Sequence, residues 1–367
     1  MARVLISDKL STKAVQILKD VKGIEVDVKT GLEPDKLGEM IGDFDGLIVR
    51  SATKVTSSII EKATKLKVIG RAGIGVDNVD LDAATQKGII VMNTPGGNAV
   101  TTAEHTISML LALARHIPQA TASIRDGKWE KSKFTGTEIF QKTIGIIGLG
   151  NIGKIVADRA LGLKMKVIAY DPFVPDDLAQ EIGVELADLN SLLERSDFIT
   201  VHVPKNKETE GLINKKSFEK MKNGVKIINC ARGGIVVEEY LLEALRSGKV
   251  AGAALDVFEK EPPQDSPLLK LDQVICTPHL GASTNEAQEN VAISIAEQIK
   301  DYFLGGTITN AVNVPSVSGE VLKTMGPYLV LAERLGSFQG QLITSPILSL
   351  EVEYSGRVLE HDIAPIT

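Results

Sequence analysis

Three polar residues of different chemistry follow apolar runs in the second half of the chain. Arg232 comes after "KIINCA", Glu261 comes soon after "AGAALDV", and His279 comes directly after "VICTP". An arginine holds a carboxylate through two parallel hydrogen bonds, whereas a histidine gives or takes a proton near neutral pH. A glutamate beside the imidazole orients the ring and favours its charged form. This combination suits hydride transfer to a carbonyl beside a carboxylate, and its reverse, with histidine as general acid and base.

The three residues converge only if the runs before them are parallel strands of one sheet. Short runs rich in valine and isoleucine alternate with helical patterns, which predicts parallel strands with crossover helices. Carboxyl ends of parallel strands meet at one edge, where ligands bind in open α/β folds. Expected strands of a first series are 3–7, 25–29, 46–50, 67–71 and 88–93. Those of a second series are 143–147, 166–170, 198–203, 226–230, 252–257 and 273–277.

A glycine-rich turn opens the second series in "TIGIIGLGNIG", where Gly148, Gly150 and Gly153 have the G-x-G-x-x-G spacing. A strand precedes the turn, a helix follows it, and the next strand ends at Asp171, eighteen residues after Gly153. This context predicts a dinucleotide site, with the pyrophosphate at the start of the helix. An acidic residue at 171 would bind ribose hydroxyls and repel a 2′-phosphate, so NAD is favoured over NADP. The alternative is a plain βαβ unit with a glycine turn.

Two longer helices and a tail complete the pattern. Residues 98–118 predict one largely apolar helix, with Thr101 and Glu104 at capping-box spacing. Ser283 and Glu286 have the same spacing and open a helix expected to reach about residue 304. The tail, residues 308–367, carries one helical pattern at 321–335 and one alternating strand pattern at 347–354. So few elements make a weak independent core, which indicates part of a larger module.

Composition narrows the class of protein. A net charge of −6 and a pI near 5.6 disfavour nucleic acid as the main partner. The chain has 367 residues and two cysteines, which predicts at least two domains and no disulfide framework. Neither a signal-peptide core nor a run long enough to cross a bilayer is present, so no membrane association and a cytoplasmic location are expected. No metal-ligand spacing occurs either.

With these residues in view, the chain resembles the D-2-hydroxyacid dehydrogenase family over roughly residues 3–310. The resemblance rests on seven stretches: "VRSATKVT" (49–56), "GRAGIGVDNVD" (70–80), "NTPGGNAVTTAEHT" (93–106), "GLGNIGK" (148–154), "NCARGGIVVE" (229–238), "ALDVFEKEPP" (254–263) and "TPHLGAST" (277–284). The first two point, within the family, to enzymes that oxidise 3-phospho-D-glycerate with NAD at the start of the phosphorylated route to serine.

The resemblance implies roles for individual residues. Arg232, Glu261 and His279 would be catalytic. Implied cofactor contacts are Ile74, Asn151, Ile152, Asp171, Val203, Cys230, Arg232, Asp256, His279 and Ala282. Implied substrate contacts are Arg50, Ser51, Gly73 and Asn98, with Arg71 near the phosphate.

The resemblance also implies a domain arrangement. Residues 1–97 and 286–307 would form a substrate-binding domain, and 98–285 an NAD-binding Rossmann domain with a cleft between the two. Residues 308–367 would belong to an incomplete regulatory domain, so feedback by serine is not expected of this chain. Pairing into a homodimer or homotetramer through the NAD-binding domain is expected, using the helix that starts near Asn98.

Two other functions remain open from the sequence. One is another reductase of the family, acting on glyoxylate or hydroxypyruvate. The other is a dinucleotide-sensing binding protein on the same fold.

Overall fold

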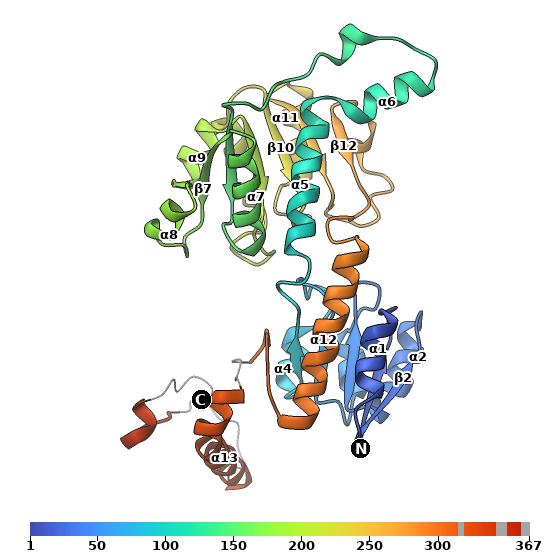
Figure 1. The fold of residues 1–367 in the computed structure, drawn as a ribbon, viewed down its shortest axis with the longest axis vertical. Helices are drawn as coiled ribbons and strands as arrows, with labels where there is room; N and C mark the ends of the chain where they lie inside the picture. The colour runs from blue at the N-terminus through green and yellow to red at the C-terminus, as the bar shows by residue number, and fades with distance from the viewer. Residues whose placement is uncertain (315–318, 343–350, 361–367) are drawn as a thin grey trace. The chain divides into compact units, whose positions relative to one another are not determined.

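Two compact units make up the chain. A computed structural model describes residues 1–314, 319–342 and 351–360. Unit 1 consists of residues 1–97 and 288–367, and unit 2 of residues 98–287. Among the described residues, no helix is both long enough and apolar enough to span a bilayer. Figure 1 labels the elements of both units.

Unit 1 contains a five-stranded parallel sheet in the order β2-β1-β3-β4-β5. The strands are β1 (Ala2–Ile6), β2 (Ile24–Val28), β3 (Gly46–Val49), β4 (Val68–Arg71) and β5 (Ile90–Met92). They coincide with the first predicted series and confirm an α/β fold with a parallel sheet. The helices are α1 (Thr12–Lys19), α2 (Pro34–Met40), η1 (Ile41–Asp43), α3 (Ser57–Lys62), α4 (Leu81–Gln86) and α12 (Asn285–Gly305).

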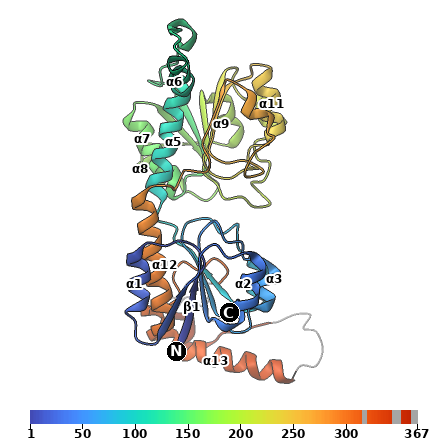
Figure 2. The same ribbon diagram turned by 90° about the vertical axis from the view of Figure 1, so that its right-hand side faces the viewer.

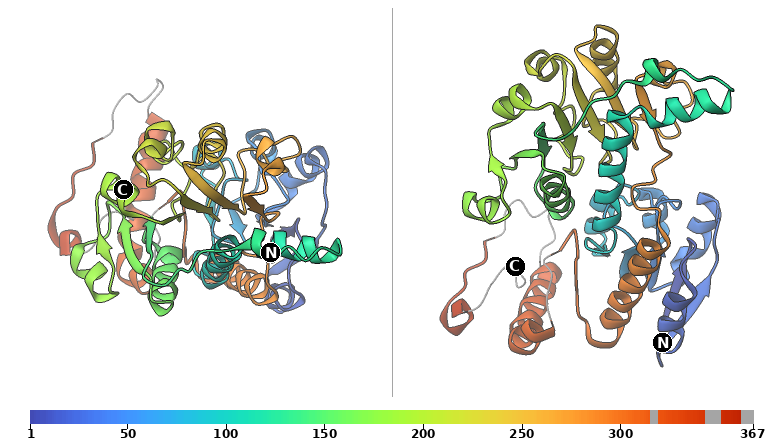
Figure 3. Two further views of the ribbon diagram at one scale, coloured as in Figure 1. Left: turned by 90° about the horizontal axis from the view of Figure 1, so that it is seen from above. Right: turned by 45° about the horizontal axis from the view of Figure 1, so that its top comes forward.

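Helices cover both faces of this sheet, which explains why the central strand β3 is apolar and buried along its whole length. Ala14 and Leu18 of α1 pack on one face with Ile295 and Ile299 of α12. Helices α2, α3 and α4 cover the other face, as Figure 2 shows. Helices α1 and α12 lie side by side although they are far apart in sequence (Figure 3). The first strands therefore have a complete core only once α12 is in place.

Unit 2 contains a seven-stranded parallel sheet in the order β12-β11-β10-β9-β6-β7-β8. Its strands are β6 (Thr143–Ile147), β7 (Lys166–Tyr170), β8 (Glu185–Leu186), β9 (Phe198–Val201), β10 (Val225–Asn229), β11 (Val250–Leu255) and β12 (Val274–Cys276). Six of them match predicted strands. The two-residue β8 was not predicted. The order reverses at β6, which places the switch point beside the glycine-rich turn.

Two layers of helices enclose the unit 2 sheet, as Figures 1 and 2 show. On one face lie α5 (Ala99–Ala114), α7 (Asn151–Gly162) and α8 (Asp176–Glu181). On the other lie α9 (Leu189–Arg195), α10 (Lys215–Lys220) and α11 (Glu238–Arg246). Two short helices, η2 (Lys131–Phe134) and η3 (Pro267–Lys270), lie in connecting segments.

Three local predictions about helices were wrong. The stretch 98–118 is broken, because His116 takes a left-handed conformation (φ 53°) and a new helix, α6 (Ile117–Arg125), begins with proline in its first turn. Thr101 and Glu104 lie inside α5, whose N-cap is Asn98, and so form no capping box. At α12 the hydroxyl of Thr284, rather than Ser283, accepts the Ala287 N–H at 3.1 Å.

The described part of the tail contains α13 (Gly319–Leu342) and η4 (Gly356–Glu360). Helix α13 includes the predicted helical pattern at 321–335 and extends beyond it. The strand predicted at 347–354 falls mostly outside the described residues, and residues 351–355 lie in no helix or strand.

Gly145→Ala is expected to destabilise unit 2. A methyl group there would lie 2.3 Å from Ser196 Oγ and 2.6 Å from Leu192 Cδ2, because β6 and α9 pack closely at this point. We expect a loss of about 1–3 kcal/mol in the free energy of unfolding, measured by chemical denaturation.

Gly162→Ala is the matched control. Gly162 is exposed at the end of α7 and has open space where a methyl group would lie. The change should be neutral or stabilising by up to about 1 kcal/mol. Equal effects of the two substitutions would contradict the close packing of β6 on α9.

Candidate active site

The glycine-rich turn between β6 and α7 is shaped by close backbone approaches. Gly148 has a φ of 95°, and a Cβ there would lie 2.7 Å from the carbonyl oxygen of His202 and 2.8 Å from Val203. A Cβ on Gly153 would lie 2.0 Å from the Gly148 oxygen. Gly150, in contrast, has no atom within 4 Å of that position. The turn is therefore tightly packed at Gly148 and Gly153 but leaves space at Gly150, where a phosphate can approach the backbone.

The start of α7 and Asp171 fit a dinucleotide in this turn. No side chain caps α7, so the N–H groups of its first turn, at Asn151, Ile152 and Gly153, have no partner within the helix. Asp171 accepts the Leu149 N–H at 2.8 Å and the Phe173 N–H at 2.9 Å. A carboxylate has about four acceptor positions, so Asp171 retains capacity for ribose hydroxyls. These residues are those expected to hold NAD.

The loop after β10 carries Arg232 and passes close to the loop after β11. A Cβ on Gly233 would lie 1.8 Å from the carbonyl oxygen of Phe258, so the two backbones are in contact. The Asn229 side chain donates to the Arg232 carbonyl at 3.0 Å, and the guanidinium donates to the Ala231 carbonyl at 2.7 Å. Arg232 is thus held at the carboxyl edge of the sheet, three residues after its strand ends.

Glu261 and His279 are in direct contact. The Nδ1 atom of His279 lies 2.7 Å from Oε2 of Glu261, while Oε1 of Glu261 accepts the Phe258 N–H at 3.1 Å. Both side chains are partly exposed. The contact leaves the Nε2 atom of the imidazole for other partners. The structure therefore brings together the acid and the imidazole that the sequence placed after different strands.

Asp256, at the end of β11, fixes the backbone on both sides of His279. Its buried carboxylate accepts the Thr277 hydroxyl at 2.6 Å and the N–H groups of Leu280 and Gly281 at 2.7 and 2.8 Å. Its carbonyl oxygen accepts the His279 N–H at 3.0 Å. These bonds hold His279 in a left-handed conformation (φ 55°), which is unusual for a residue with a side chain.

His105 of α5 belongs to the same network. Its Nε2 atom lies 3.1 Å from the Thr277 hydroxyl and 3.3 Å from Oδ1 of Asp256. A sequence signal for this contact existed. Thr102, His105 and Thr106 place polar groups three and four residues apart on one side of an otherwise apolar helix.

The network shifts the pKa values of the two catalytic candidates in opposite directions. The pKa of His279 is raised, first by the hydrogen bond to Glu261 and then by the negative charges of Glu261 and Asp256, against burial and the positive charge of Arg232. Burial alone would raise the pKa of Glu261, but the hydrogen bond and charge of His279 lower it overall.

Cys230 directly follows β10 and is buried near Asp256. Burial, followed by the charge of Asp256, raises the pKa of its thiol to about 12. At neutral pH the sulfur is therefore a thiol, which is a poor nucleophile. Within the described residues, no group of three or more histidines, cysteines or carboxylates is arranged to hold a metal ion.

The expected substrate residues of unit 1 follow β3 and β4, which are neighbours in its sheet. Asp8 accepts the Arg50 N–H at 2.6 Å and the Thr53 N–H at 3.1 Å, and the Asn78 side chain donates to the Arg50 carbonyl at 2.6 Å. The loop 50–53, which includes Ser51, is therefore fixed, and it presents a guanidinium at the carboxyl edge of the sheet.

Arg71 ends β4 and folds back across Gly73. Gly73 has a φ of 140°, a conformation that favours glycine, and a Cβ there would lie 1.7 Å from the Arg71 Nη1 atom. The Gly73 N–H donates to the Thr94 hydroxyl at 2.7 Å, and the Asn93 side chain donates to the Ile74 carbonyl at 2.6 Å. Arg50 and Arg71 thus lie on adjacent strand ends of one sheet.

The remaining two expected contacts lie in unit 2. Asn98 is the N-cap of α5, and its side-chain oxygen is buried without a hydrogen-bond partner in the structure. Ala282 follows the Gly281 N–H that Asp256 accepts and is half-buried.

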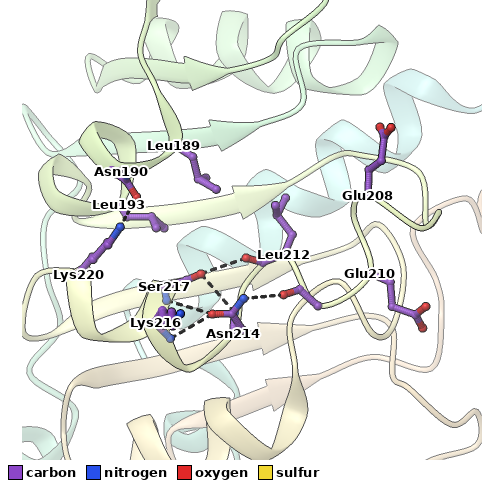
Figure 4. A pocket seen from close by; sticks show the side chains of 11 residues that line it. Leu189, Asn190, Leu193, Glu208, Glu210, Leu212, Asn214, Lys216, Ser217 and Lys220 are labelled. Atoms are coloured by element: carbon purple, nitrogen blue, oxygen red, sulfur yellow. Dashed lines mark hydrogen bonds between the residues drawn. The ribbon is translucent and has the colours of Figure 1, made fainter.

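A pocket at the starts of α9 and α10 is lined by neither Arg232, Glu261 nor His279. Figure 4 shows that Asn190 and Lys220 are hydrogen-bonded to each other and that Asn214 and Ser217 are bonded to nearby groups. Asn214, for example, accepts the Lys216 N–H at 3.0 Å and donates to the Gly211 carbonyl at 3.0 Å. These groups serve the local fold, so we assign the active site to the edge that carries His279.

Comparison with known families identifies the class of protein. Residues 107–281 match the model for the D-isomer specific 2-hydroxyacid dehydrogenase NAD binding domain. Residues 324–367 match the D-3-phosphoglycerate dehydrogenase intervening domain. The fold and the site thus define an NAD-dependent dehydrogenase of the D-isomer specific 2-hydroxyacid class.

Curated relatives show which family within this class the chain belongs to. D-3-phosphoglycerate dehydrogenase of Archaeoglobus fulgidus is 51% identical over 97% of this chain and 68% of its own length. The human enzyme of that name is 48% identical over 98% of this chain and 68% of its own length. The chain belongs to the D-3-phosphoglycerate dehydrogenase family. It spans about two thirds of the length of these relatives, with coverage between 65% and 69%.

Solved structures share the fold. The TT0316 protein from Thermus thermophilus aligns with a TM-score of 0.77 and 35% identity, covering 84% of this chain and 99% of its own. D-lactate dehydrogenase from Aquifex aeolicus, complexed with NAD and lactic acid, aligns with a TM-score of 0.74 and 30% identity. That alignment covers 86% of this chain and all of the other.

Glu261→Gln is expected to lower the pKa of His279. The substitution removes the negative charge and weakens the hydrogen bond that together raise this pKa, while the positive charge of Arg232 remains. The measurement is an NMR titration of the histidine rings in the free protein, with His279→Asn used to assign the signal. An unchanged titration would show that the Glu261 contact does not form in solution.

Proposed function

We propose that this chain oxidises 3-phospho-D-glycerate to 3-phosphooxypyruvate with NAD, at the start of the phosphorylated route to serine. The observation that carries the proposal is the 2.7 Å contact between His279 and Glu261, at the sheet edge that also carries Arg232 and the glycine-rich turn. Relatives that are 45–51% identical over nearly the whole chain bear the name of this activity.

His279 takes the proton of the substrate's 2-hydroxyl group in this proposal. Its Nδ1–H donates to Glu261, so the neutral ring has its lone pair on Nε2 and accepts the hydroxyl proton there. Glu261 stabilises the imidazolium that forms, because its carboxylate is ionised at neutral pH. The chemistry that NAD supplies when bound is the uptake of hydride from C2. In the reverse direction protonated His279 returns the proton to the carbonyl oxygen.

The cationic residues bind the two anionic ends of the substrate. Arg232 holds the C1 carboxylate through paired hydrogen bonds, close to His279, so the 2-hydroxyl lies within reach of the imidazole. We assign the phosphate to Arg50 and Arg71, which lie on adjacent strand ends of unit 1, with Ser51, Gly73 and Asn98 as further substrate contacts. This assignment is what distinguishes phosphoglycerate from an unphosphorylated 2-hydroxy acid.

The two units divide the work in this proposal. Residues 98–285 bind NAD, residues 1–97 with 286–307 bind the substrate, and 308–367 belong to a regulatory domain. The proposed cofactor contacts outside the glycine-rich turn are Ile74, Val203, Cys230, Arg232, Asp256, His279 and Ala282.

Self-association through unit 2 and a cytoplasmic location complete the proposal. Exposed apolar side chains support pairing, since Ile117 and Ile124 of α6 are 52% and 54% exposed, Trp129 is 84% exposed and Phe140 is 61% exposed. Apolar area of this kind marks protein contacts. A homodimer or homotetramer would cover it.

His279→Asn should abolish oxidation of 3-phospho-D-glycerate while leaving NADH bound. Asparagine keeps a polar side chain of smaller size but takes no proton at neutral pH, so a loss of about 10²–10⁴-fold in kcat is expected. The assay follows absorbance at 340 nm with a panel of 2-hydroxy and 2-oxo acids, and NADH binding is followed by fluorescence. NADH binding by the wild-type protein without turnover of any acid would favour a dinucleotide sensor.

Arg50→Gln should weaken binding of phosphorylated substrates selectively. Loss of a charge-assisted contact should raise KM for 3-phosphooxypyruvate by roughly 10- to 100-fold and leave KM for hydroxypyruvate nearly unchanged. Lys54→Gln, which removes an exposed cation from the next part of the same loop, is the control. Parallel changes for both substrates in Arg50→Gln would refute the phosphate assignment.

A further inference from the structure

The loops that carry Arg232 and Glu261 are joined by more than the backbone contact at Gly233. Glu238, in the first turn of α11, and Glu259, two residues before Glu261, exchange hydrogen bonds. The Glu238 N–H donates to Oε1 of Glu259 at 2.9 Å, and the Glu259 N–H donates to Oε1 of Glu238 at 2.6 Å. We call these two residues the reciprocal pair.

The reciprocal pair takes the place of an ordinary helix cap. The N-cap residue of α11 is Val237, which has no side-chain acceptor, and no side-chain hydrogen bond caps the helix locally. The carboxylate of Glu259 accepts the Glu238 N–H from a different loop, at the end of the helix that favours negative charge. A cap supplied from another loop holds that loop in place as well as the helix.

The carboxylates of Glu238 and Glu259 repel each other because both carry negative charge. Burial raises the pKa of Glu238, and the negative charge of Glu259 raises it further. Hydrogen bonds to two backbone N–H groups oppose this repulsion. The two carboxylates therefore stay close together because each accepts a backbone N–H group of the other residue.

From the reciprocal pair a short path leads to the imidazole. Phe258, next to Glu259, donates its N–H to Oε1 of Glu261 at 3.1 Å, and Oε2 of Glu261 contacts His279. The carbonyl oxygen of Phe258 lies against the backbone of Gly233, the residue after Arg232. Movement of Glu259 would therefore change the positions of both Glu261 and Arg232 relative to His279.

We propose that Glu238 and Glu259 are positioning residues for the reaction, whose reciprocal hydrogen bonds hold the Arg232 loop and the Glu261 loop in one fixed relation. This role rests on the proposed function, because it acts through Arg232 and Glu261. Neither glutamate touches the substrate in the proposal. Their part is to keep the guanidinium and the carboxylate at the distances from the imidazole that proton transfer needs.

The first test measures His279 in the free protein and needs no turnover. The chain has five histidines, so ring-labelled protein gives few signals, and His279→Asn identifies the relevant one. In Glu259→Ala the pKa of His279 should move toward its lower value in Glu261→Gln. The charged groups that act on this pKa are Glu261, Asp256 and Arg232, and Glu259 is not among them.

The second test separates positioning from stability by kinetics. Glu259→Ala should lower kcat on the order of tenfold or more, with KM for NAD within about twofold of wild type. Because the neutral imidazole is needed for oxidation, the acidic limb of the kcat profile should move to lower pH. Glu259→Gln keeps an acceptor oxygen for the Glu238 N–H and should restore most of kcat and the original limb.

Two further variants complete the design. A double variant with both Glu238→Ala and Glu259→Ala should lower kcat about as much as the more damaging of the two single changes. Either change alone already breaks the reciprocal pair. Glu239→Ala removes an exposed acid from the same turn of α11 and should leave kcat and the His279 titration unchanged.

The outcomes separate cleanly. If Glu259→Ala lowers only the thermal stability and leaves both the His279 titration and the kcat profile as in wild type, the reciprocal pair is a structural cap and the proposal is wrong. If wild-type protein reduces no NAD with any 2-hydroxy acid, the proposed function fails, while the histidine titration still decides the role of the reciprocal pair.

Discussion

The buried negative charge of Asp256 is the constraint on which the site depends. Burial disfavours that charge, but hydrogen bonds from His105, Thr277 and two backbone N–H groups lower its pKa and keep it ionised. Those bonds determine where the chain turns after β12 and force His279 into a conformation that few side chains adopt. Because Asp256 fixes the backbone around His279, Glu261 in the loop after β11 can contact the imidazole. A pre-set geometry of this kind avoids reorganisation when charge moves during the reaction.

Much of this arrangement could be predicted from the sequence, because it follows from local patterns and one rule of sheet geometry. Alternating apolar runs and helical segments were enough to predict both parallel sheets, and the glycine spacing predicted the turn that Gly148 and Gly153 form. The contact between Glu261 and His279 followed from placing strand ends on one edge. Some of the missed features depend on tertiary contacts. His105, for example, contacts Thr277 across 172 residues of sequence. The break at His116 was missed for a local reason, since it depends on one residue in a left-handed conformation.

The two helix caps predicted from capping-box spacing were also wrong. A threonine or serine followed by a glutamate three residues later indicates a helix start, yet Thr101 lies inside α5 and Thr284 rather than Ser283 caps α12. Helix α11 shows the opposite case, since its cap comes from Glu259, twenty-one residues away. Local spacing cannot show a cap that arrives from another loop. In this fold that non-local cap is also what joins the loops carrying two of the three catalytic candidates.

Unit 1 is assembled from two stretches of chain with the whole of unit 2 between them, and this has a consequence for biosynthesis. The strands at the N-terminus leave the ribosome first, but the face of their sheet that α12 covers stays bare until residues 288–305 follow. At ordinary rates of translation the intervening 190 residues, 98–287, take about 10–40 s. During that interval the part of this face that α12 covers stays exposed on the nascent chain, and unit 2 has all of its strands only when the interval ends.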